Sequence, residues 1–179
     1  MAVDIRNLAF LLSLSALIQA ILLGIQYLGY RSREGLGRWS LGSLLLALGF
    51  FLNYLRSNPS LGPLAVVGNP VLFVAGLGLI LSGVRRFLGL PRSDLGPILL
   101  CLLVALLGLF FTFLNDSAAA RRINLSMAVA FLSFLIGGTL LSRMAVREKW
   151  AQILLAALFL VNGLFWTIRG LSPLFGSTG

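Results

Sequence analysis

Histidine is absent from this sequence of 179 residues, and cysteine occurs only once, as Cys101. Zinc sites and disulfide frameworks need several such residues, so this chain can build neither. A Ser–His dyad and a histidine-based intramembrane metalloprotease are excluded for the same reason. Cys101 lies within an apolar run, which indicates a small core side chain rather than a reactive thiol. We therefore expect no metal and no cofactor.

Acidic residues are also scarce. All five lie in connectors between apolar runs or near the N-terminus: Asp4, Glu34, Asp94, Asp116 and Glu148. Paired carboxylates for general acid–base catalysis are therefore lacking. The apolar runs hold no ionisable group away from their ends, whereas proton-coupled transporters usually place such groups at membrane depth. We predict no catalytic residue and no enzymatic activity within these residues.

Long apolar runs dominate the sequence. Hydrophobic residues make up 59% of it and charged residues 11%, against roughly 25% charged in a soluble domain. A membrane-spanning helix needs about 20 apolar residues. Six runs approach that length: 8–30, 39–55, 64–84, 97–114, 123–141 and 150–168. Short connectors make successive helices antiparallel neighbours. The prediction is an all-α integral membrane protein, with residues 1–179 forming one antiparallel bundle of six transmembrane helices.

The basic residues indicate how such a bundle lies in the membrane. The formal net charge is +9, and thirteen of the fourteen basic residues are arginine. Because they occupy short gaps between apolar runs, they favour contact with lipid headgroups over nucleic-acid binding. The first, third and fifth connectors hold nine of them, and the remaining connectors and termini hold five. The positive-inside rule then places the N-terminus outside.

One constellation of side chains is a candidate ligand site at the outer face. The second run ends in "FFLNYLR" and the sixth in "NGLFWTIR", so each combines aromatic rings, an amide and a terminal arginine. Arginine beside aromatic walls suits an anionic or aromatic ligand. An aromatic belt with arginines reaching the headgroups is the alternative. The candidate residues are Asn53, Tyr54, Arg56, Asn69, Asn162, Trp166 and Arg169.

Neutral polar and small residues inside the runs are expected to serve packing. Side chains such as Asn69, Asn124, Ser133 and Asn162 suit hydrogen bonds between helices, or else the lining for a polar or lipid-like ligand. Glycines such as Gly42 and Gly76 permit close helix approach. Pro70 predicts a kink or a late start in the third helix.

The stretch "YRSREGLGRWSLGSLLLALGFFLNYLR", followed by "GNPVLFVAGLGLILSGVRRFLGLP", carries a family resemblance. It resembles the N-terminal multi-pass sensory region of bacterial diguanylate cyclases with GGDEF output domains, most strongly over residues 27–91. "FWTIRGLSPL" extends the likeness. The resemblance implies a seven-helix module in the bacterial inner membrane, a homodimer, and a cytoplasmic cyclase that makes cyclic di-GMP from two GTP. Neither a seventh span nor a GG[DE]EF motif occurs here, so the cyclase activity cannot be assigned to these residues.

These observations lead to three hypotheses. The first is a sensory module that relays a stimulus, from an unknown small or lipid-like ligand, to a cytoplasmic output domain or partner. The second is a small permease, channel or transporter subunit, which would need a polar path and often an inverted repeat. The third is a structural assembly factor.

Overall fold

The computed structural model describes residues 5–29, 35–56, 61–91, 94–142 and 149–175. No strand occurs within these ranges. The helices are α1 (Ile5–Gly29), α2 (Leu36–Leu55), α3 (Gly62–Phe87), α4 (Leu95–Leu109), η1 (Phe110–Leu114), α5 (Ala118–Ser142), α6 (Lys149–Leu171) and η3 (Ser172–Phe175).

Local sequence explains where several of these helices begin. Gly35 precedes α2 with φ of 108°, a left-handed conformation that glycine adopts without steric penalty. A proline lies in the first turn of α3, where the missing N–H would have had no helical acceptor. The Ser117 hydroxyl accepts a hydrogen bond from the Ala120 N–H at 3.2 Å and caps α5. At the end of α4 the backbone continues as the π-helical turn η1.

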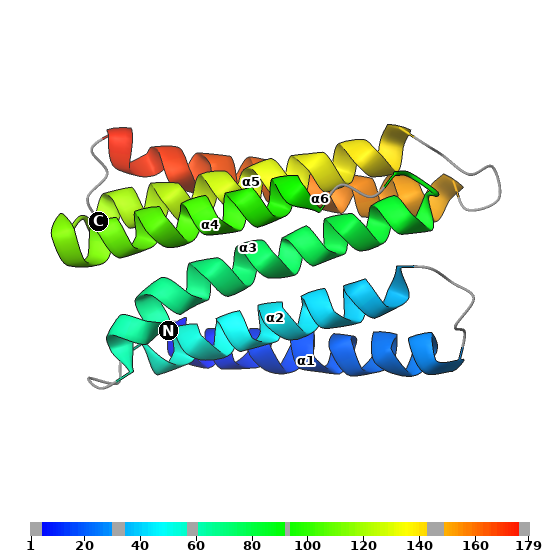
Figure 1. The fold of residues 1–179 in the computed structure, drawn as a ribbon, viewed down its shortest axis with the longest axis horizontal. Helices are drawn as coiled ribbons and strands as arrows, with labels where there is room; N and C mark the ends of the chain where they lie inside the picture. The colour runs from blue at the N-terminus through cyan, green and yellow to red at the C-terminus, as the bar shows by residue number, and fades with distance from the viewer. Residues whose placement is uncertain (1–4, 30–34, 57–60, 92–93, 143–148, 176–179) are drawn as a thin grey trace.

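Successive helices run antiparallel, and α3 lies in the middle of the molecule (Figure 1). On one side α3 packs on α2, which in turn packs on α1. On the other side it packs on α4 and α5, and α6 packs on α5. The fold therefore consists of two helical groups that share α3.

The buried core follows this central helix. It joins α3 residues such as Val74 and Leu81 to α5 residues such as Leu132 and Ile136. Trp39 packs against the core near one end of the bundle and Trp166 near the other. Two glycines bring α2 and α3 together, because a Cβ at Gly42 would lie 2.7 Å from the carbonyl oxygen of Gly76. Because glycine has no side chain, the backbones of α2 and α3 approach closely here and gain extensive dispersion contacts.

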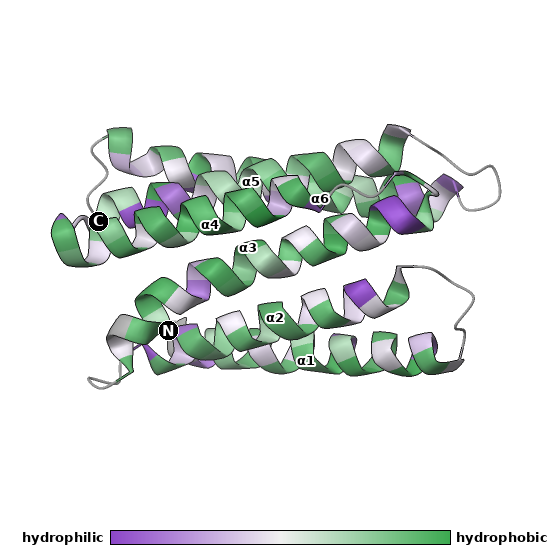
Figure 2. Ribbon diagram, in the orientation of Figure 1, coloured by the Kyte–Doolittle hydropathy of each residue, from purple (hydrophilic) through white to green (hydrophobic). Residues whose placement is uncertain are grey.

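The outer surfaces of the helices are largely apolar, and the hydrophilic segments concentrate near the helix ends (Figure 2). Among the described residues, six helical segments are long and apolar enough to cross a membrane: Asn7–Gly29, Leu36–Leu55, Leu64–Phe87, Leu95–Leu114, Ala118–Ser142 and Lys149–Phe175. The predicted all-α class and the six long apolar helices are thus confirmed.

Two finer expectations have different outcomes. Helix α3 does not start late, because it begins at Gly62 and continues through Pro70. Hydrogen bonds between helices are confirmed: Asn69 donates to the Gly49 carbonyl at 2.7 Å, Asn124 to that of Val104 at 3.1 Å, and Asn162 to the Ser133 hydroxyl at 2.9 Å. The threonines within the described helices behave otherwise. Each donates to the carbonyl four residues earlier in its own helix.

Candidate functional site

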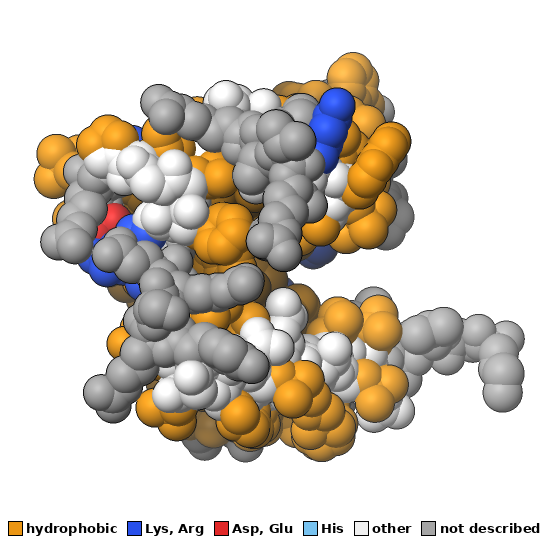
Figure 3. Space-filling view, turned by 90° about the vertical axis from the view of Figure 1, so that its right-hand side faces the viewer, with side chains coloured by type: hydrophobic (Ala, Val, Ile, Leu, Met, Phe, Trp, Pro, Cys, Tyr) orange, Lys and Arg blue, Asp and Glu red, His pale blue; other side chains and the backbone are white. Residues whose placement is uncertain are grey.

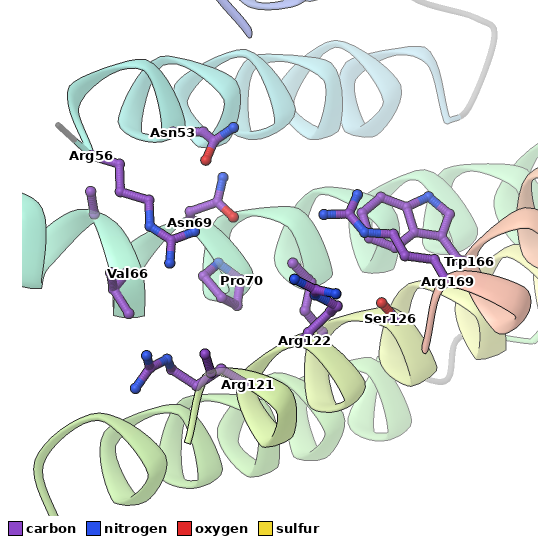
Figure 4. Close-up of a pocket in the computed structure, with 13 residues that line it drawn as sticks. Asn53, Arg56, Val66, Asn69, Pro70, Arg121, Arg122, Ser126, Trp166 and Arg169 are labelled. Carbon is purple, nitrogen blue, oxygen red and sulfur yellow. The ribbon is translucent and has the colours of Figure 1, made fainter. Parts of the chain in front are cut away.

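A polar pocket of about 180 Å³ lies at the end of the bundle where α2 and α6 finish and α3 and α5 begin. Four arginines line it: Arg56 from the end of α2, Arg121 and Arg122 from the first turns of α5, and Arg169 from the last turn of α6 (Figure 4). We call this site the arginine pocket. Its other polar lining residues are Asn53, Asn69 and Ser126.

The four arginines differ in their partners. Arg121 forms an ion pair with Asp116 and also donates to the Phe111 carbonyl at 2.5 Å. Within the part of the chain that the structure describes, Arg56, Arg122 and Arg169 have no carboxylate partner. The Arg169 guanidinium lies over the Trp166 ring, with its Cζ 4.7 Å from the centroid. A cation held over a ring face keeps its N–H donors available at the guanidinium edge.

Ser126 is the most deeply buried polar residue of the pocket, with 0% exposure. Among the described residues its hydroxyl has no hydrogen-bond partner. Gly170 closes this region, because a Cβ there would lie 3.0 Å from the Ser126 Cβ. A buried hydroxyl without a partner loses about 1–3 kcal/mol relative to a bonded one. It is therefore available to donate to a ligand.

The walls of the pocket are held in place by ordinary packing. Asn69 is fixed by its bond to the Gly49 carbonyl on α2, and Figure 4 places Asn53 beside it. Trp166 packs against the apolar core. Helix α5 points its N-terminus at the pocket, and the macrodipole adds positive potential there. The arrangement can attract and bind an anion.

The opposite end of the bundle also carries an arginine, but here the charge is compensated. Arg38 Nη1 on α2 lies 2.8 Å from both carboxylate oxygens of Asp94, which precedes α4. The Ser82 hydroxyl on α3 donates to the same carboxylate. The Ser82 hydroxyl, followed by Arg38, lowers the pKa of Asp94 despite its partial desolvation. We call this region the Arg38–Asp94 end.

Trp39 lies next to Arg38 and links the same helices. Its indole N–H donates to the Ile80 carbonyl at 3.2 Å, and its ring contacts Phe87 with centroids 5.6 Å apart. Viewed from this end, acidic and basic side chains meet at one edge of the molecule, while the surface is hollowed between the upper and lower helical groups (Figure 3).

The structure brings together five of the seven residues predicted for the outer ligand site. Asn53, Arg56, Asn69, Trp166 and Arg169 all line the arginine pocket. Tyr54 and Asn162 are not among its lining residues. The Tyr54 ring faces α1 instead, where its centroid lies 5.6 Å from that of Phe10. Asn162 lies one turn deeper than Trp166 and bonds to Ser133.

Three charged or hydroxyl-bearing residues of the pocket were not among the predicted ones: Arg121, Arg122 and Ser126. In the sequence the two arginines read as headgroup anchors in a connector. A usable signal was nevertheless present, because residues 118, 122, 125 and 126 recur at helical spacing and so share one face. That face carries Ala118, Arg122, Leu125 and Ser126, and all four line the pocket.

Two further hollows lie between neighbouring helices and are lined mainly by apolar side chains. One, of about 510 Å³, joins residues of α2, α3 and α4 beside Arg38 and Asp94. The other, of about 430 Å³, lies between α4 and α5. Across the described ranges, no group of three His, Cys, Asp or Glu residues could hold a metal ion.

The fold and the site together define a class: an all-α protein whose described part has six helices long and apolar enough to cross a membrane and an arginine-lined pocket at one end. Compared with known proteins, the chain matches no family model, no curated protein and no solved structure. Functional inference therefore rests on the residues themselves.

Proposed function

We propose that this chain is the membrane-embedded sensory input module of a bacterial signalling protein, and that its stimulus is an anion bound in the arginine pocket. The observation that carries this proposal is the convergence of Arg56, Arg122 and Arg169 from three helices without carboxylate partners among the described residues. Arginines that only anchor helices to headgroups would point outward separately rather than share a pocket.

The distribution of basic residues supports a definite orientation in the bacterial inner membrane. Nine basic residues belong to the first, third and fifth connectors expected from the sequence, which the positive-inside rule assigns to the cytoplasm. The described ones, such as Arg38 and Arg85, lie at the Arg38–Asp94 end. Of the five basic residues at the other end, four line the arginine pocket. The basic residues that run against the positive-inside rule are thus gathered at one site. This arrangement suits a specific role at the outer face, which is also the side of the N-terminus.

The proposed mechanism is a change in helix packing. A bound anion would contact α2 through Arg56, α5 through Arg122 and α6 through Arg169, and so would draw the two helical groups together around α3. Helices α2 and α3 are locked by their close glycine contact at Gly42 and Gly76. A shift at the pocket would therefore reach the Arg38–Asp94 end through rigid helices, biasing a two-state arrangement there.

The resemblance to GGDEF-associated sensory modules suggests the output. In such a protein the change would pass to a cytoplasmic domain or partner that makes cyclic di-GMP, with two copies of the chain acting as a homodimer.

A permease, channel or transporter subunit is the main alternative class. It would need a polar path between the two ends. In the described structure the space between them is occupied by an apolar core that includes Val74, Leu77, Leu132 and Ile136. This core favours a relay through packing over a conduit.

The three tryptophans allow the sensory hypothesis to be tested directly. Trp166 reports on the pocket, Trp39 on the Arg38–Asp94 end, and the exposed Trp150 serves as a control. The chain would be labelled with 5-fluorotryptophan, its ¹⁹F resonances assigned with single Trp→Phe variants, and inorganic phosphate and succinate added as anionic probes. A relay predicts that an anion shifting the Trp166 resonance also shifts that of Trp39, while Trp150 stays unchanged.

Proteoliposomes provide the second arm of this test. A sensory module should give no flux of the bound anion above protein-free vesicles. Robust flux by these residues alone, or an anion that shifts Trp166 and leaves Trp39 unmoved, would contradict the sensory proposal.

A further inference from the structure

The charge balance of the arginine pocket restricts the ligand. Arg121 shares its charge with Asp116, whereas three guanidinium groups have no carboxylate partner in the described ranges. Although Arg56, Arg122 and Arg169 are exposed, like charges that share a pocket repel one another. A ligand that neutralises this site therefore needs at least two negative charges.

The directions from which the arginines approach restrict the shape of the ligand. Arg56, Arg122 and Arg169 extend from α2, α5 and α6, so they approach the pocket from three sides (Figure 4). A carboxylate offers two oxygens in one plane and is satisfied by one or two guanidinium forks. A phosphate group offers oxygens in tetrahedral directions, and several forks can bind it at once.

The other residues that line the arginine pocket also suit a phosphate group. The buried Ser126 hydroxyl can donate a hydrogen bond, and the N-terminus of α5 adds positive potential. A volume of about 180 Å³ is below the roughly 300–1,000 Å³ of pockets that enclose drug-sized ligands. It suits a single small headgroup.

We infer that the arginine pocket binds a phosphate group carrying about two negative charges, either inorganic phosphate or a phosphomonoester, the latter free or at the head of a lipid. The inference rests on the proposed function in treating this pocket as the stimulus site, and it names the chemical class of the stimulus. Because it concerns binding, it is tested without reference to signalling.

The experiment uses the full chain in dodecyl maltoside micelles, which contain no phosphate. Binding is followed by the ¹⁹F resonance of Trp166. The probes are inorganic phosphate, sn-glycerol 3-phosphate and dioleoyl phosphatidic acid, with succinate as the matched dianion at equal ionic strength. At least one phosphate probe should bind about tenfold more tightly than succinate, as expected when additional charge-assisted hydrogen bonds form. The phosphate probe with the lowest Kd identifies the free or the lipid source.

Matched variants separate a built site from general charge attraction. Arg122→Gln and Arg169→Gln should each weaken phosphate binding about tenfold or more. Arg85→Gln removes the same charge outside the pocket and should leave the Kd within about twofold, since screened distant charges contribute little. Arg122→Lys keeps the charge but loses the fork, so it should weaken binding markedly. Ser126→Ala should weaken it less than either Arg→Gln variant.

The proposal is overturned if succinate binds as tightly as the phosphate probes, if no phosphate probe shifts Trp166, or if Arg85→Gln weakens binding as much as Arg122→Gln. Size-exclusion profiles and helical circular dichroism confirm that each variant is folded. Should a variant fail to fold, the wild-type comparison of phosphate with succinate still decides. Tight phosphate binding without movement of Trp39 would support this inference and contradict the sensory function. If only succinate shifted Trp39, the result would support the sensory function and contradict the inference of phosphate binding.

Discussion

The two ends of the bundle use the same residue type in opposite ways. At the Arg38–Asp94 end, the Arg38 guanidinium donates to the Asp94 carboxylate, which precedes α4, and to the Ser82 hydroxyl on α3. At the arginine pocket, three guanidinium groups lie together without such partners in the described structure. A compensated charge joins helices and contributes to the fold, whereas uncompensated charges at a shared pocket can pair with an anion. The difference assigns structural packing to the Arg38–Asp94 end and, under the proposed function, recognition to the arginine pocket.

The largest expected effect on stability comes from the packing that holds Trp39 beside Arg38. At Gly83 a Cβ would collide with the Trp39 ring and lie 2.9 Å from the Gly35 carbonyl oxygen. We expect Gly83→Ala to lower the free energy of unfolding by about 1–3 kcal/mol, as overpacking usually does. Titration with sodium dodecyl sulfate in mixed micelles, followed by circular dichroism, measures it.

Gly170→Ala at the arginine pocket is the matched control for that change. Its Cβ would meet the flexible Met127 Cε at 2.9 Å and the Ser126 Cβ at 3.0 Å, so the neighbours can adjust more easily. Equal losses of stability at the two glycines would contradict the assignment of structural packing to the Arg38–Asp94 end.

The next largest effect is the difference in stability between substitutions of Arg38 and of Arg122. Arg38→Gln removes the partner of Asp94 and should lower stability by about 1 kcal/mol, the upper range for a partly exposed ion pair. Arg122→Gln removes a charge without a carboxylate partner and should change stability by less than about 0.5 kcal/mol. The same detergent titration applies. If Arg122→Gln destabilised the protein more than Arg38→Gln, the pocket arginines would have a structural role.

The smallest effect concerns pH. Since folding lowers the pKa of Asp94, its contribution is present above the unfolded value of about 3.9 and is lost as pH falls through the folded value. Its carboxylate side chain is 38% exposed, so the contribution should stay below about 1 kcal/mol. As pH falls from 5 through the folded pKa of Asp94, the wild type should lose up to this amount of stability relative to Asp94→Asn. Parallel pH curves for the two proteins would show that the ion pair contributes nothing.

Most of the fold could be predicted because hydropathy and chain length dictate it. Each of the six runs corresponds to one helix, and the observed helices mostly extend a few residues past the predicted ends. These extensions consist of polar or turn residues, such as Arg121 and Arg122 in α5. Counting the apolar residues in a run does not reveal these extensions, because capping and backbone hydrogen bonding decide where a helix ends.

The pocket was only partly predictable, for reasons of helical geometry. Asn53 and Arg56 are three residues apart and share a face, whereas Tyr54 is rotated by about 100° from Asn53 and faces α1. Asn162 shares a face with Trp166 but lies one turn deeper, where Ser133 of α5 is within reach. Which helix meets each face is a tertiary property. For that reason the helical spacing groups Arg122 and Ser126 on one face of α5, but it does not show that this face meets the pocket.

The position of α3 between the two helical groups has a consequence for biosynthesis. Helices α1, α2 and α3 leave the ribosome first and can complete their mutual contacts before α4 is made. The arginine pocket cannot form then, because Arg122 belongs to α5 and Arg169 to the last turn of α6. The arginine pocket is therefore complete only when the second group has packed on α3. Under the proposed function, ligand binding would report an assembled molecule, and a nascent chain would not respond prematurely.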